Sequence, residues 1–140
     1  MNTINGQRLA LFVGAYFIIT MAWAYPWHIL WFHDVYRDMG AFTRDAPVMS
    51  LGILAVVIQG ATIGYLYPFF DRVFLIGGHP IIRAVIFNLV IGLMTYTAMG
   101  FATAAKFAIE PVGLFLAYHT IFQFIQFVLT GMALGWIYRR

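Results

Sequence analysis

The stretch that decides the fold is the last apolar segment, 118–140, which reads YHTIFQFIQFVLTGMALGWIYRR. At 1.5 Å per residue it is long enough to cross a bilayer as one helix. Trp136 and Tyr138 are aromatic residues of the kind that marks a membrane interface, and two arginines follow them. We expect the rest of the chain to pack around this helix.

One face of this segment is polar, because its polar side chains recur at helical spacing. Further polar residues, Gln59 among them, interrupt two earlier apolar segments. Such a seam can line a path for a small polar solute, or it can form interhelical hydrogen bonds worth about 0.6–2 kcal/mol per pair. The second interpretation is favoured, since no charged residue accompanies the seam through the membrane. The predicted polar seam consists of Asn88, Thr95, His119, Gln123, Gln126 and Thr130.

Two GxxxG pairs predict close contacts between helices, because glycine lets two backbones approach. One pair is Gly60 and Gly64, and the other is Gly131 and Gly135. The pattern does not separate contacts within one chain from contacts between subunits. We expect at least one pair to join separate subunits.

Composition excludes a soluble protein. The chain is 63% hydrophobic and 9% charged, whereas an ordinary soluble domain is about 45–50% apolar and about 25% charged. The basic residues are scattered among apolar segments, so no nucleic-acid partner is indicated. There is no cysteine, which excludes disulfides and thiolate metal sites.

Four apolar segments predict an all-α, polytopic membrane protein, a four-transmembrane-helix bundle that forms one integral membrane domain over 1–140. Pro26 is expected to kink the first helix or to start a short second piece, and Pro68 to contribute to the end of the second span. The expected spans are about 9–32, 47–70, 81–107 and 111–138.

Four spans place both termini on one side of the membrane. Five basic residues lie on that side and three on the other, and basic residues favour the cytoplasmic side. We therefore predict that both termini are cytoplasmic. The two sets are Arg8, Arg72, Arg83, Arg139 and Arg140 on the first side, and Arg37, Arg44 and Lys106 on the second.

His28 and His119 are candidate ligands, because imidazoles from two spans can hold a haem or a metal ion. The alternative is that each histidine is neutral and hydrogen-bonded to a neighbouring helix. No carboxylate lies beside them within the apolar segments, and a bare pair lacks the ligand set that metal sites usually show. We therefore predict no cofactor and no metal site.

Three short motifs resemble a group of small bacterial four-helix inner-membrane proteins of unknown function. They are Tyr25-Pro26-Trp27-His28, Leu66-Tyr67-Pro68 and the stretch 126–135. The resemblance implies a four-span fold in a bacterial inner membrane. It brings no catalytic or binding residues with it.

These observations favour an accessory or structural subunit that packs against other membrane proteins or copies of itself. A small channel or carrier for a polar solute is the alternative, and a haem- or metal-binding membrane protein is the third. No residue pattern indicates a catalytic site, so an enzyme is not the favoured class.

Overall fold

The computed structural model describes residues 5–44, 46–73 and 78–139. Within these ranges the chain forms helices and no strand, and it contains helical segments long and apolar enough to cross a membrane. The prediction of an all-α bundle with four such helices is confirmed. The four segments are Gly6–Trp31, Met49–Val73, Pro80–Lys106 and Val112–Tyr138.

The first two spans are built differently from each other. The first consists of α1 (Gly6–Tyr25) and a π-helical turn, η1 (Pro26–Trp31), and a short helix, α2 (His33–Asp38), follows it. Pro26 starts this π-helical turn, in agreement with the expectation of a kink or a short second piece at this residue. The second span is the single helix α3 (Met49–Val73).

The third span also contains a π-helical turn. It runs through α4 (Pro80–Tyr96), η2 (Thr97–Phe101) and α5 (Ala102–Lys106). The fourth span is α6 (Val112–Tyr138), the longest helix of the described chain.

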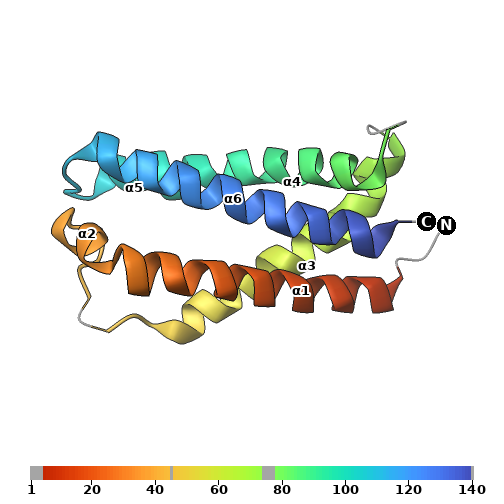
Figure 1. Ribbon diagram of the computed structural model, residues 1–140, viewed down its shortest axis with the longest axis horizontal. Coiled ribbons are helices and arrows are strands. Elements are labelled where there is room, and N and C mark those ends of the chain that lie inside the picture. Colours follow the sequence, from red (N-terminus) through yellow and green to blue (C-terminus); the bar gives the residue numbers. More distant parts are fainter. Residues whose placement is uncertain (1–4, 45, 74–77, 140) are drawn as a thin grey trace.

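Helix α6 lies between α4 and α1, and α3 crosses the bundle beside α1 to reach α4 (Figure 1). The start of α1 and the end of α6 lie at the same end of the bundle, where Arg8 Nη1 donates to the Tyr138 carbonyl over 3.3 Å. We call this the terminal end, and the opposite end, which holds α2 and α5, the loop end. Because α3 crosses at an angle, its first residues, 49–55, are exposed on the surface of the bundle.

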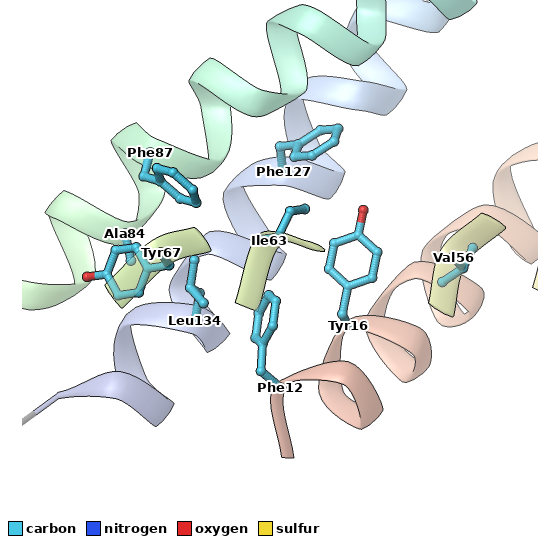
Figure 2. Close-up of a cluster of buried hydrophobic side chains, with 9 residues drawn as sticks. All are labelled: Phe12, Tyr16, Val56, Ile63, Tyr67, Ala84, Phe87, Phe127 and Leu134. Carbon is cyan, nitrogen blue, oxygen red and sulfur yellow. The ribbon is translucent and has the colours of Figure 1, made fainter. Parts of the chain in front are cut away.

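The core has two parts. One cluster lies toward the terminal end and takes side chains from all four spans (Figure 2). Its members are Phe12, Tyr16, Val56, Ile63, Tyr67, Ala84, Phe87, Phe127 and Leu134. A second cluster lies toward the loop end and consists of Trp27, Tyr36, Met39, Ile109, Phe115 and Phe122.

Both GxxxG pairs pack within one chain. A Cβ on Gly135 would lie 2.5 Å from the Ile81 Cα, and one on Gly131 would lie 2.8 Å from the Val85 Cα, so α6 and α4 touch through their backbones. The other pair, on α3, packs against side chains of α1. We expected one pair to join separate subunits, but all four glycines are already buried against helices of their own chain. The expected contact between subunits stays a prediction, and these glycines already have partners within the chain.

Pro68 does not end α3, contrary to the prediction that placed the end of the helix near residue 70. Proline has no N–H, so the carbonyl of Gly64, one turn earlier, loses its usual helical donor. The hydroxyl of Tyr138 donates to this carbonyl over 2.8 Å. A side chain from α6 thus supplies the missing hydrogen bond, and α3 continues to Val73.

Candidate functional site

The centre of the bundle contains a hydrogen-bonded polar network. Gln126 on α6 donates through Nε2 to the Tyr16 hydroxyl and to Thr20 Oγ1 on α1, over 3.5 and 3.4 Å. The Tyr16 hydroxyl in turn donates to Gln59 Oε1 on α3 over 3.1 Å. Gln126 and its partners therefore connect three spans across the apolar interior.

A second set of hydrogen bonds adds the third span. Asn88 on α4 donates through Nδ2 to Thr130 Oγ1 and to the Phe127 carbonyl on α6, each over 2.7 Å. Thr130 Oγ1 donates to the Gln126 carbonyl over 2.8 Å. Asn88 and Thr130 are both fully buried. The seam residues Asn88, Gln126 and Thr130 thus belong to one connected group that reaches all four spans.

Tyr16 and Thr20 complete this network but are absent from the predicted seam. They lie four residues apart on α1, so they share a face, and both are buried. That spacing was the available signal. It was weak, because a tyrosine in an apolar run is equally typical of a membrane interface.

The other predicted seam residues lie outside the network. Thr95 Oγ1 donates to the Gly92 carbonyl of its own helix over 2.9 Å. His119 and Gln123, nearer the loop end of α6, are each 7% exposed. His119 Nε2 and Gln123 Oε1 have no hydrogen-bond partner within the described part of the chain. The predicted seam therefore does not form one continuous set of hydrogen bonds, because only half of its residues belong to the network.

The His119 ring lies between two aromatic rings. Its centroid is 5.5 Å from that of Phe115 and 5.7 Å from that of Tyr96, with both pairs close to parallel. The π-helical turn η2 passes beside it, because a Cβ on Gly100 would lie 3.2 Å from His119 Cδ2. Aromatic packing thus surrounds much of the imidazole.

His28 lies in η1, the π-helical turn of the first span. Its Nδ1 lies 3.2 Å from the Ala24 carbonyl oxygen, and its ring meets the Phe122 ring edge to face with centroids 4.4 Å apart. Phe122 is three residues from His119 on α6, so the two histidines belong to the same end of the bundle. They come from different spans, as the sequence indicated.

The described residues contain no group of three or more His, Asp or Glu side chains placed to hold a metal ion. The acidic residue nearest to His28 in sequence is Asp34, which pairs with Arg37 at the surface over 3.1 Å, and the one nearest to His119 is Glu110. His28 and His119 are thus brought to one end of the bundle without a third ligand of this kind. That no cofactor and no metal is bound stays a prediction, and binding of a haem or metal ion at these histidines is the third functional alternative.

An ion pair at the terminal end joins α3 to α4, and the sequence did not indicate it. Arg83 Nε donates to Asp71 Oδ1 over 2.7 Å, and Arg83 Nη2 donates to Asp71 Oδ2 over 3.2 Å. The Tyr67 hydroxyl also donates to this carboxylate over 3.2 Å. In the sequence, Arg83 contributes only to the count of basic residues that predicts the orientation, since its pairing with Asp71 depends on how the two helices meet.

The fold and the polar network define a class of protein, the helical membrane proteins with four apolar spans. Comparison with protein-family models, with curated proteins and with solved structures found no match. The function must therefore be argued from the geometry of this chain.

Proposed function

We propose that this protein is an accessory or structural subunit of a membrane assembly, which acts by packing against other membrane proteins or copies of itself. The observation that carries the proposal is that side chains of the polar seam form hydrogen bonds between spans. Gln126, Asn88 and Thr130 are engaged in hydrogen bonds between spans. Side chains that bind each other across helices fix the helices and leave few polar groups for a solute.

The charge distribution supports the same function. Asp71 and Arg83 lie at the terminal end and bind each other, and Lys106 ends the third span at the loop end. Between their ends, the described spans carry no Asp, Glu, Lys or Arg. Coupled transporters use charged groups near the middle of the membrane, and the described part of this bundle offers none there.

A lipid-facing groove on α1 is the surface that we propose for packing. Ala10 and Gly14 lie four residues apart on the exposed face of the helix, and a Cβ on Gly14 would meet nothing within 4 Å. Leu11 and Ile18 also line the groove. Small residues at this spacing allow a second transmembrane helix to approach closely. Since both GxxxG pairs are used within the chain, Ala10 and Gly14 offer a small-residue pair that is still open to a partner.

Filling this groove tests the proposal. In mild detergent, the wild-type protein is expected to run as a complex or oligomer on a native gel, and Gly14→Phe is expected to shift it to the monomer. Gly113→Phe is the matched control, because a Cβ there also meets nothing within 4 Å but lies on α6 at the loop end. A wild-type protein that is monomeric at all concentrations, with no copurifying membrane protein, would contradict the proposal.

A small channel or carrier for a polar solute is the second candidate. The observation that favours it is a set of buried polar atoms without a partner in the described part of the chain: Asn88 Oδ1, His119 Nε2 and Gln123 Oε1. Buried polar atoms of this kind commonly bind water. Flux of a small polar solute into reconstituted vesicles is the measurement that would favour this candidate over a structural subunit.

We further propose a bacterial inner membrane as the location, with both termini in the cytoplasm. Four arginines lie at helix ends that belong to the terminal end of the bundle, which supports this orientation: Arg8 at the start of α1, Arg72 at the end of α3, Arg83 at the start of α4 and Arg139 after α6. Arg140, the fifth basic residue counted for this side, lies outside the described residues.

A further inference from the structure

A cleft of about 410 Å³ opens at the loop end, between η1, the segment after α2 and the first turn of α3. It lies where the first span ends at Trp31 and the second begins at Met49. This is the level at which a membrane protein meets lipid headgroups. The cleft therefore faces the headgroup region and the hydrocarbon beside it.

Part of the lining of this cleft is apolar. Ile29 comes from η1, Leu51 from the first turn of the second span, and Val48 directly precedes that span. All three are exposed, Leu51 by 64%, because α3 stands away from the bundle here. These side chains offer an apolar surface that begins inside the cleft and continues toward the membrane.

The lining also contains a cation. Arg44 is exposed, and it has no ion pair or hydrogen bond among the described residues, which do not include the adjacent Asp45. The other basic side chain of the lining, His33, differs because its Nδ1 lies 3.4 Å from Asp34 Oδ1. Arg37 on α2 also binds this carboxylate, over 3.1 Å. Arg44 is therefore the guanidinium that the cleft offers to an anion.

The aromatic part of the lining is fixed in place. The Phe42 ring stacks on the buried Tyr36 ring, with centroids 5.3 Å apart, and the Phe42 N–H donates to the Tyr36 carbonyl over 3.3 Å. The Tyr36 hydroxyl accepts from Trp27 Nε1 over 3.1 Å. Burial raises the pKa of Tyr36 above its usual value, so the phenol stays protonated and neutral at physiological pH. A ligand would thus meet a cleft that already exists.

Gly40 sets the path of the chain into the cleft. Its φ of 78° lies in the left-handed region, and a Cβ there would lie 2.8 Å from the Ala108 carbonyl oxygen. The Glu110 N–H donates to the Met39 carbonyl over 3.0 Å and fixes the same turn. The segment that carries Arg44 is therefore anchored to the loop that precedes α6.

We propose that this cleft binds an anionic phospholipid, with the phosphate at Arg44 and an acyl chain along Ile29, Val48 and Leu51. A phospholipid joins an anion to an apolar chain at the depth where the cleft joins a cation to an apolar surface. The inference does not depend on the proposed function, because it uses a different surface from the groove on α1.

Native mass spectrometry of the full-length protein in mild detergent tests this assignment. The probes are phosphatidylglycerol and phosphatidylcholine with identical acyl chains. We expect an apparent Kd about five-fold lower for phosphatidylglycerol, the effect of roughly one basic residue at a membrane surface. Arg44→Gln should remove this preference, and the matched control Arg37→Gln should keep it.

Two results would overturn the assignment. One is an equal affinity of the wild-type protein for both lipids, or a preference that survives Arg44→Gln. The other is competition by glycerol phosphate at the concentration at which the lipid binds, which would show an anion site without a lipid chain. If Arg44→Gln does not fold, the wild-type preference is measured at low and at high salt, and a preference insensitive to salt excludes a role for Arg44.

Discussion

At the terminal end of the bundle, α4 and α6 meet through their backbones at Gly131 and Gly135, and the ionic groups of Asp71 and Arg83 are paired. At the loop end, the first and fourth spans meet through aromatic rings, such as the nearly parallel rings of Trp23 and Phe122. Polar atoms also differ between the two ends. The Gly64 carbonyl at the terminal end accepts a hydrogen bond from another span. Two of the three buried side-chain atoms without a partner in the described chain, on His119 and Gln123, lie toward the loop end, and the third, on Asn88, lies beside Gly131.

This difference indicates that the end of the bundle that resists unfolding most strongly is not the end that offers polar groups to a ligand. Backbone contact and paired polar groups restrict how far the helices can move against each other. The terminal half should therefore resist unfolding most strongly. The loop half contains both π-helical turns and the cleft, so it is the half in which a ligand has polar groups to contact. The groove on α1 that we propose for a partner is mostly apolar and lies toward the terminal end. We expect substitutions to affect stability at the terminal end more than at the loop end.

The largest effect is expected for Gly135→Ala. Its new Cβ would lie 2.5 Å from the Ile81 Cα, and a backbone atom cannot move aside as a flexible side chain can. We expect a loss of about 3 kcal/mol in the free energy of unfolding, measured by denaturant titration in detergent. Gly113→Ala is the control, since a Cβ there meets nothing within 4 Å. Equal stability of the two variants would remove the basis for a rigid terminal end.

An intermediate effect is expected for Asp71→Asn, which weakens the pair with Arg83. Both side chains are mostly buried, with exposures of 19% and 23%. The loss should be about 2 kcal/mol, the range for a hydrogen bond to a charged group. Asp34→Asn at the loop end removes an exposed ion pair and should cost less than about 0.5 kcal/mol. The same denaturant titration compares the two variants, and a larger loss for Asp34→Asn would reverse the proposed contrast.

The smallest effect distinguishes two amides on α6. Gln126→Leu removes the hydrogen bonds to Tyr16 and Thr20 and should cost about 1 kcal/mol. Gln123→Leu removes an oxygen with no partner in the described chain, so stability should change by less than about 0.5 kcal/mol. Thermal unfolding in detergent measures both. If Gln126→Leu instead keeps full stability and abolishes the flux of a small polar solute into reconstituted vesicles, the seam is a conduit.

The sequence predicted the features that depend on composition and local spacing. Four apolar segments were enough for four spans, because in lipid a helix satisfies all of its backbone groups within one segment. The same reasoning failed at Pro68. Local chemistry indicates a break there, but the donor that lets the helix continue is Tyr138, which lies 74 residues beyond Gly64 in the sequence.

The polar network was predictable only in part. Gln126, Asn88 and Thr130 stand out as polar residues in apolar segments, whereas the role of Tyr16 depends on the neighbours that it meets. The GxxxG spacing predicts close contacts between helices but not their partners, since glycine spacing carries no information on which helix approaches. From the sequence, Arg44 enters only the comparison of basic residues that predicts the orientation in the membrane. The cleft beside it is formed by segments that come together only in the fold.

The hydrogen bond from Tyr138 to the Gly64 carbonyl has a consequence for the order of events during synthesis. The ribosome makes α3 well before α6, so the second span enters the bilayer with this carbonyl lacking both its helical donor and its eventual partner. A carbonyl without a hydrogen-bond donor in or near lipid is unfavourable. Its free energy cost therefore favours docking of the fourth span once that span is made. The fourth span therefore completes the hydrogen bonding of a helix made much earlier, and a nascent chain released before Tyr138 would leave that helix incomplete.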